Sequence, residues 1–183
     1  MTRERVFLDI DGVLADLINP LCQAMGFPVA SWPAGVYSAH KVLGAEDPHG
    51  VWGHPEIMRR EFWRDLPVLP WAHELVAEVE QRFGAAPVLL TQTIASPECM
   101  AGKHEWIERH FPKLDFWVGR AKHHIAAPGA WLIDDAESNV ESWRAHGGEA
   151  VLFPARWNHR YRFESDPMPH VLAGLPKTKK VTT

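Results

Sequence analysis

The sequence predicts an α/β protein built on a parallel β-sheet, with a small helical cap inserted after the first strand. Three observations predict this fold. Short apolar runs alternate with helical patterns along the chain, which is typical of parallel sheets. The first apolar run ends in acidic residues and a glycine. The stretch that follows, about 16–70, breaks the alternation and contains no clear strand.

Five short apolar runs are expected to form the sheet. They are, in chain order, Val6–Ile10, Ala86–Thr91, Asp115–Val118, Ala130–Asp134 and Glu149–Phe153. Helical patterns are expected over Trp71–Phe83, Pro97–His110 and Glu137–His146. The last pattern stops at Gly147-Gly148, a typical helix C-cap sequence.

The breaks in this rhythm suggest a domain division. We expect residues 1–15 and 71–170 to form the core domain, 16–70 a small, mainly helical cap, and 171–183 a flexible C-terminal tail. The cap stretch holds prolines, glycines and aromatic residues. It would cover the carboxyl edge of the sheet, where open α/β sheets bind ligands.

Composition excludes several classes of protein. The 183 residues are 46% hydrophobic, enough for a sizeable core. The net charge of -4 argues against a surface for a nucleic-acid polymer. Cys22 and Cys99 are far apart, which favours free thiols in a reducing compartment.

Targeting and membrane signals are also not expected. The first strand begins within a few residues of Met1, so we expect no signal or transit peptide. No apolar run approaches the ~20 residues of a membrane span. A cytoplasmic protein without a membrane partner is expected. Its oligomeric state, including a homodimer, is left open.

The first strand carries the most informative residues of the chain. Asp9 and Asp11 are spaced i and i+2, so an extended strand would put both carboxylates on one face, and Gly12 allows the backbone to turn. Mg²⁺ takes oxygen ligands of this kind. One carboxylate could attack a substrate while the other handles protons.

Other polar residues stand at or near the ends of later strands. They are Thr91, the pair Asp134-Asp135, and Lys122 with Arg120 before the fourth strand. The carboxyl ends of parallel strands meet at one edge, so these side chains would assemble into one pocket. Several carboxylates, two cations and a hydroxyl suit a phosphate group together with Mg²⁺.

The ordered set DIDGV, a Thr ending the second apolar strand, a Lys and LIDD resembles the four motifs of the haloacid dehalogenase-like (HAD) phosphatases. This resemblance implies a HAD-like, Rossmann-type three-layer fold. Two aspartates in the first motif resemble the phosphatase branch, because dehalogenases lack the second one and need no metal.

Four further segments resemble the 5'(3')-deoxyribonucleotidases. They are Phe62–Pro70, Gly102–Glu108, Gly119–Lys122 and Val151–Asn158, and the likeness runs from about Arg5 to Asn158. Three positions depart from that family. Gln92 follows the motif threonine where the family usually has serine, Ala121 replaces an aspartate, and Trp71 replaces a glycine.

The resemblance implies a role for each matching residue. Asp9 would be the nucleophile that forms an aspartyl-phosphate, and Asp11 the general acid and base. Mg²⁺ would lie between the Asp9 side chain, the Asp11 backbone carbonyl and Asp134, with Asp135 orienting a water or the loop. The phosphate contacts would be Thr91, Gln92, Lys122, Lys103 and Arg120. The cap would supply a base and sugar pocket from Trp32, Trp52, Phe62 and Trp63.

Plainer interpretations exist for several of these residues. Asp134-Asp135 is also typical of a helix N-cap. Lys122 and Lys103 could be solvated lysines, and the cap tryptophans could be core residues. A zinc site is not expected, because the eleven histidines lack ligand spacing.

The sequence therefore predicts Mg²⁺-dependent hydrolysis of a nucleoside monophosphate, with a deoxyribonucleotide as the leading substrate. One alternative is a HAD phosphatase acting on another small phosphomonoester, such as a sugar phosphate, or on a polynucleotide 3'-end. A small cap over the site argues against the polymer. A second alternative is a catalytically silent HAD-fold binding module. The presence of both Asp9 and Asp11 argues against it, since a silent copy has no need of a proton-handling acid.

Overall fold

A computed structural model describes residues 4–177. Five parallel strands form one sheet in the order β3-β2-β1-β4-β5. Their bounds are β1 Arg5–Leu8, β2 Val88–Thr91, β3 Phe116–Val118, β4 Ala130–Asp134 and β5 Glu149–Leu152. The five predicted strands are confirmed. The first is shorter than predicted, so Asp9 follows the strand instead of lying inside it.

Helices lie on both faces of the sheet. The helices of the core are α5 Ala72–Phe83, α6 Pro97–His110, α7 Glu137–Ala145 and α8 Met168–Gly174, with short 3₁₀ turns at η2 Lys122–Ile125 and η3 Tyr161–Phe163. The three helices predicted after the insertion are present, and α6 has the predicted bounds. In α6, Pro97 stands in the first turn and the Ser96 hydroxyl accepts a hydrogen bond from the Cys99 amide at 3.4 Å, as expected of a helix start.

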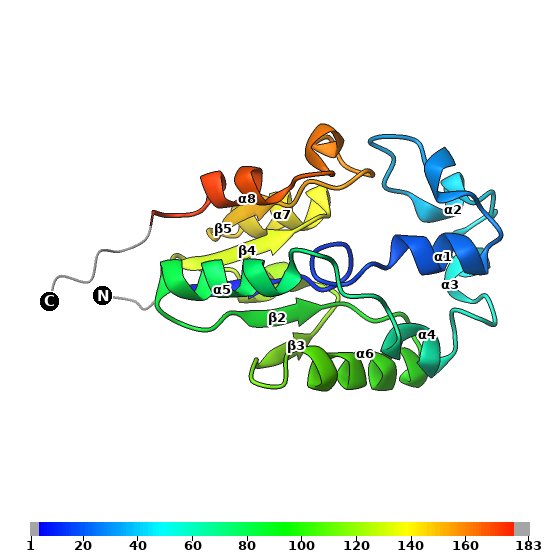
Figure 1. Ribbon diagram of the computed structural model, residues 1–183, viewed down its shortest axis with the longest axis horizontal. Coiled ribbons are helices and arrows are strands. Elements are labelled where there is room, and N and C mark those ends of the chain that lie inside the picture. The colour runs from blue at the N-terminus through cyan, green and yellow to red at the C-terminus, as the bar shows by residue number, and fades with distance from the viewer. Residues whose placement is uncertain (1–3, 178–183) are drawn as a thin grey trace, which may run out of the picture.

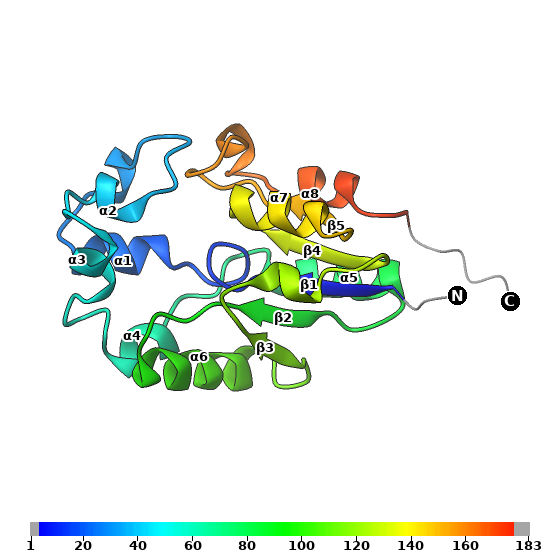
Figure 2. The ribbon, with the colours of Figure 1, turned by 180° about the vertical axis from the view of Figure 1, so that it is seen from behind.

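The alternation of side chains along β1 produces the three layers. Val6 and Leu8 belong to the buried cluster that contains Leu75 and Val79 of α5. Phe7 points to the other face and packs edge-on against Trp143 of α7, with ring centroids 5.4 Å apart. Helix α5 accordingly lies in front of the sheet in Figure 1, and α7 lies in front of it in Figure 2. This is the predicted α/β architecture.

We refer to residues 16–70 as the cap segment. It contains α1 Ile18–Ala24, η1 Val29–Ser31, α2 Ala39–Val42, α3 Pro48–Trp52 and α4 Arg60–Arg64, with no strand among them. Figure 1 shows these helices gathered beyond the carboxyl ends of the strands. The chain enters and leaves the segment side by side, because the Asp16 amide donates to the Pro67 carbonyl and the Leu69 amide to the Leu14 carbonyl, both at 2.8 Å.

The C-terminal boundary differs from the expectation. The expected tail began at 171, but α8 continues to Gly174, and Val171 and Leu175 are buried. These apolar side chains join the main core cluster, so packing against the sheet extends past the expected boundary. The last part of the expected tail, 178–183, lies outside the described residues.

Among residues 4–177, no helix has both the length and the apolar character needed to cross a membrane.

Candidate active site

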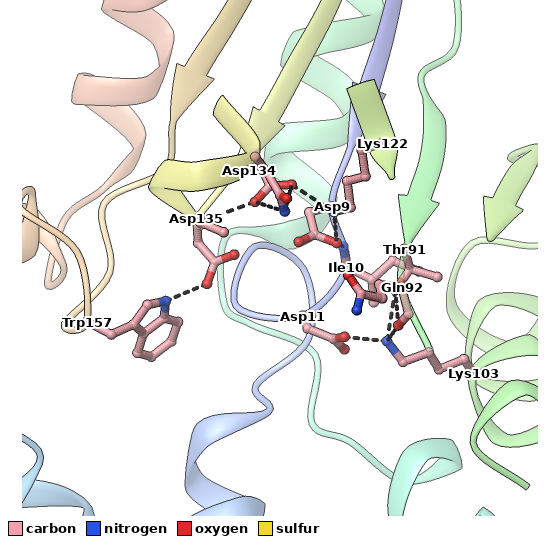
Figure 3. A network of polar contacts seen from close by, with 12 residues as sticks. Asp9, Ile10, Asp11, Thr91, Gln92, Lys103, Lys122, Asp134, Asp135 and Trp157 are labelled. Carbon is pink, nitrogen blue, oxygen red and sulfur yellow. Dashed lines mark hydrogen bonds and ion pairs between the residues drawn. The ribbon is translucent and has the colours of Figure 1, made fainter. Parts of the chain in front are cut away.

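The polar residues predicted at the strand ends do meet at one edge of the sheet. Asp9 directly follows β1, and its amide donates to the Ile133 carbonyl of β4 at 2.9 Å. Thr91 ends β2 and Asp134 ends β4, the two strands that flank β1. Figure 3 shows their side chains facing a common space below the strand ends. The parallel sheet therefore gathers residues that are far apart in the sequence.

Lys122 forms the centre of the buried charge cluster. Its ammonium lies 2.8 Å from Asp9 Oδ1 and 2.7 Å from Asp134 Oδ2, and the residue is buried. Burial opposes the charge of Lys122, but Asp134 and Asp9 outweigh it and raise the pKa of this lysine above its usual value. The first turn of η2, which begins at Lys122, brings the side chain under the strand ends.

Opposing influences act on the charge of Asp9. Burial raises the pKa of Asp9 to about 7, against the opposing pull of Lys122 and with a further push from Asp134 and Asp11. The protein alone therefore supplies too little positive charge to keep this carboxylate fully ionised at neutral pH. A bound cation is the physical means of supplying the rest.

The two aspartates after β4 have different surroundings. Both oxygens of Asp134 are used by the protein, since Oδ1 accepts from the Ala136 amide at 2.8 Å, Oδ2 accepts from Lys122, and Asn139 Nδ2 lies 3.1 Å and 3.0 Å from the two oxygens. Asp135 accepts from the Trp157 indole through Oδ2 at 2.5 Å. Its pKa is raised well above the usual range, first by burial and then by Asp134 and Asp9.

The donor set suits a hard divalent cation. Asp9, Asp134 and Asp135 each offer a buried carboxylate oxygen within 4.8 Å of the other two. Carboxylate oxygens are the ligands that Mg²⁺ and Ca²⁺ prefer. The residues present therefore fit the predicted metal. Within this group Asp134 already accepts hydrogen bonds on both oxygens, whereas Asp135 accepts one, so Asp135 is a candidate ligand beside the predicted Asp9 and Asp134.

Gly12 brings the first loop close to this cluster. Its φ is +79°, and a Cβ placed there would lie 2.7 Å from the Trp157 ring and would also collide with the Asp135 carboxylate. Only glycine allows the backbone to pass so near both side chains. The predicted turn is present, and tertiary contact adds a second reason for the glycine.

Asp11 faces a different group. Its Oδ2 accepts from the buried Lys103 ammonium, while its Oδ1 is buried with no hydrogen-bond partner among the described residues. Lys103 also donates to Thr91 Oγ1 at 2.8 Å and to the Gln92 carbonyl at 2.7 Å. The dashed lines in Figure 3 trace this second network beside the first. An unpartnered buried oxygen costs free energy unless a ligand or water uses it.

The side chains of the other two predicted phosphate contacts, Arg120 and Gln92, lie outside these two networks. Arg120 is exposed, and its side chain forms no hydrogen bond or ion pair with residues 4–177. Gln92 contributes its backbone carbonyl, and its side chain is exposed. Both still lie close to the strand end, because the Gly119 amide donates to the Thr91 carbonyl at 3.0 Å.

The predicted base pocket separates into two pairs. Trp32 and Trp63 are buried, and their indoles donate to the carbonyls of Val36 at 2.8 Å and Ile57 at 2.7 Å. These two are core side chains of the cap segment with no free face for a base, which corrects their predicted role. Trp52 and Phe62 are half-buried and keep accessible surface.

Three residues at the site escaped the sequence analysis. Trp157 and Asn139 bind Asp135 and Asp134, and no local pattern marks such contacts. Tyr37 of the cap segment is 57% exposed. Desolvation and then the charges of Asp135 and Asp134 raise the pKa of Tyr37 above its ordinary value. Its phenol therefore lies within the field of the carboxylates. For Tyr37, the sequence offered one signal, an aromatic residue within the insertion.

Comparison with known proteins extends this picture. Residues 3–165 match the model of the family described as "5' nucleotidase, deoxy (Pyrimidine), cytosolic type C protein". A protein of Staphylococcus epidermidis named "Putative 5'(3')-deoxyribonucleotidase" is 29% identical over 174 residues, covering 90% of each chain. A Staphylococcus aureus protein of the same name is 28% identical over 167 residues, covering 86% of each.

Solved structures share the fold at low identity. One, described as a "putative phosphoglycolate phosphatase" from Lactobacillus delbrueckii subsp. bulgaricus, has a TM-score of 0.58 at 14% identity and covers 97% of this chain and 94% of its own. The L-2-haloacid dehalogenase of Xanthobacter autotrophicus has a TM-score of 0.52 at 11% identity, with coverage of 94% and 87%. These likenesses establish a HAD-like fold.

Proposed function

Because the chain belongs to the 5' nucleotidase, deoxy (Pyrimidine), cytosolic type C family, and is thus a hydrolase of the phosphatase and nucleotidase type, we propose that it is a Mg²⁺-dependent 5'(3')-deoxyribonucleotidase. It would convert deoxynucleoside monophosphates to nucleoside and phosphate. The observation that carries the proposal is the division of labour between Asp9 and Asp11. Asp9 belongs to the cation-demanding cluster, whereas Asp11 lies outside it with one unpartnered oxygen.

In the proposed reaction Asp9 attacks phosphorus and the bond from phosphorus to the nucleoside oxygen breaks. Asp11 gives its proton to the leaving oxygen, because an alkoxide is a poor leaving group at neutral pH. Asp11 then takes a proton from the water that cleaves the aspartyl-phosphate. The net change is one water consumed, with nucleoside and phosphate released.

We propose that Asp9, Asp135 and the backbone carbonyl of Asp11 hold the Mg²⁺. The ion would supply the positive charge that the raised pKa of Asp9, about 7, indicates is missing. Asp134 would act through its partners, fixing Lys122 and Asn139 instead of binding the ion.

Phosphate binding is assigned to Lys122 and the Thr91 hydroxyl, both buried at the strand ends. Arg120 and the Gln92 side chain stay candidate phosphate contacts, since both are exposed beside Thr91. Residues 16–70 would act as a cap domain over a core of 1–15 and 71–170. Phe62 and Trp52 would contact the base, and the half-exposed Tyr37 supports a substrate-facing surface on this segment. The description of the family also supports a cytosolic location.

Two other functions remain distinguishable by experiment. A sugar-phosphate phosphatase would use the same carboxylates without a base pocket. A silent binding module would bind Mg²⁺ or nucleotide without turnover.

The decisive experiment measures phosphate release from matched ribo- and deoxyribonucleoside monophosphates, with sugar phosphates and a 3'-phosphorylated oligonucleotide as controls. Each reaction is run with Mg²⁺ and again with EDTA. We expect deoxynucleotides to be hydrolysed fastest and chelation to stop the reaction until Mg²⁺ is added back. If deoxyribose 5-phosphate is hydrolysed as fast as the deoxynucleoside monophosphates, the nucleotidase assignment is rejected. If no ester is hydrolysed, the result favours the silent binding module.

A further inference from the structure

The second network raises a question about Lys103. A lysine ammonium has three hydrogens to donate and no lone pair. In this structure all three are directed to protein oxygens, namely Asp11 Oδ2, Thr91 Oγ1 and the Gln92 carbonyl. The residue is also buried, with 3% of its surface exposed. Lys103 therefore has no donor left over for a phosphate oxygen.

The direction of these bonds determines where two other protons lie. Because the ammonium can only donate, Asp11 Oδ2 must accept. When Asp11 is protonated, its hydrogen therefore resides on Oδ1, the buried oxygen without a partner among residues 4–177. In the same way Thr91 Oγ1 accepts from Lys103, so the hydroxyl hydrogen of Thr91 points elsewhere, toward the Gln92 carbonyl at 3.4 Å.

The position of the ammonium depends on the cap segment. Its Nζ lies over the ring of Trp63, 5.1 Å from the centroid, and a Trp face is the strongest aromatic partner for a cation. Trp63 is itself held by its indole bond to the Ile57 carbonyl. It also packs edge-on against Phe62, with ring centroids 5.2 Å apart.

Helix α4 of the cap segment packs closely against α6, the core helix that carries Lys103. The preceding residue, Gly102, would place an added Cβ 2.8 Å from the Trp63 Cβ and in collision with the Arg60 carbonyl. An outer ion pair between Arg60 and Glu105 spans the same junction. The cap segment and Lys103 are thus packed without an intervening side chain.

From this arrangement we propose that Lys103 is a positioning residue for the general acid, which orients Asp11 so that Oδ1 delivers the proton, and that Trp63 couples this orientation to the cap. The proposal rests on the proposed phosphatase function. It replaces the predicted role of Lys103 as a phosphate contact and gives buried Trp63 a role other than base stacking.

The test compares two phosphate esters that differ in their need for an acid. A deoxynucleoside monophosphate must receive a proton on its leaving oxygen, whereas 4-nitrophenyl phosphate leaves readily as a phenolate. The quantity compared is kcat/KM, because it reports the steps up to departure of the leaving group. It is insensitive to the later attack by water, which both substrates share.

We expect Lys103→Met to lower kcat/KM for the nucleotide by about 100-fold and for the aryl ester by less than about 5-fold, given the usual contribution of a general acid. A phosphate-binding role for Lys103 predicts equal losses on both substrates, and that result would overturn the proposal. A wild-type enzyme inactive on both esters would instead reject the proposed function, so the two failures are distinguishable.

Variants of Trp63 provide a second test, which remains informative if the Lys103 variant does not fold. Trp63→Leu should lower kcat/KM for the nucleotide by roughly tenfold, and Trp63→Phe by less, since a smaller aromatic face still attracts the ammonium. The aryl ester should respond little to either change. If Trp63→Leu and Trp63→Phe lower kcat/KM equally for the nucleotide and the aryl ester, Trp63 has only a packing role.

Trp106→Phe is the matched control. Trp106 is another buried tryptophan, and its indole donates to the Leu66 carbonyl at 2.8 Å. Loss of this hydrogen bond in Trp106→Phe should change the stability of the protein. It should not change the ratio of kcat/KM for the nucleotide to kcat/KM for the aryl ester. A ratio altered as much as in Trp63→Phe would count against a specific role for Trp63.

Discussion

Two buried lysines divide the candidate site into unlike halves. Lys122 lies between Asp9 and Asp134, which follow or end the adjacent strands β1 and β4. Lys103 meets one carboxylate, two neutral oxygens and the ring of Trp63 from the cap segment. The nucleophile half is therefore built within the core, whereas the proton-handling half is shared with the insertion.

The largest expected effect concerns the nucleophile. Asp9→Asn replaces the attacking oxygen with an amide and should lower phosphate release by at least about 1,000-fold, since losing a nucleophile removes the covalent step. The measurement is a phosphate-release assay with enzyme whose circular dichroism matches the wild type. More than about 1% residual turnover would mean that Asp9 is not the attacking group.

The next prediction compares the two lysines by stability. Lys122→Met leaves two buried carboxylates without their cation, and breaking a buried pair costs about 3–5 kcal/mol. Lys103→Met should cost less, about 1–3 kcal/mol, because the Asp11 side chain keeps 20% of its surface exposed. Urea unfolding in EDTA measures both. Equal losses would show that the halves are not energetically distinct.

Asp9 should give the nucleophile half a dependence on pH. Burial raises the pKa of Asp9 to about 7 from an ordinary value of 3.8. Between those values the folded protein holds a proton that the unfolded chain has lost, so this group lowers stability as pH rises from about 4 to 7. A metal must displace the same proton, and Mg²⁺ affinity should therefore rise by up to about tenfold per pH unit towards 7 and then level off.

Magnesium titrations followed by tryptophan fluorescence at several pH values test this dependence. Asp9→Asn is the matched control, in which the slope attributable to this group should disappear. A wild-type affinity that does not change from pH 5 to 7 would remove the cation-demanding interpretation of Asp9.

The smallest expected effect concerns base recognition by the cap segment. Phe62→Ala should raise KM for a deoxynucleoside monophosphate by about tenfold, within the usual range for one stacked base. It should leave KM for deoxyribose 5-phosphate, which lacks the base, nearly unchanged. Phe163→Ala, a partly exposed phenylalanine outside the cap segment, is the control. Equal changes with both substrates would exclude stacking by Phe62.

Local patterns in the sequence predicted much of this protein. The short apolar runs identified five strands, and the helical pattern over Pro97–His110 has the bounds observed for α6. The convergence of Asp9, Thr91 and Asp134 also followed from sequence, because the ends of parallel strands share one edge. The strand argument for Asp9 and Asp11 was wrong in detail, because β1 ends at Leu8 and the two carboxylates meet different lysines.

Only the tertiary structure decided which atoms remain free for chemistry. Asp134 and Asp135 look alike in sequence, yet Lys122 and Asn139 saturate one while Trp157 holds a single oxygen of the other. Lys103 meets Asp11 across 92 positions of the chain, over a tryptophan that the sequence suggested for a nucleobase. The physical reason is that a hydrogen-bonding atom is used or left free by whatever packs against it. For these residues the partners come from remote segments that no local pattern encodes.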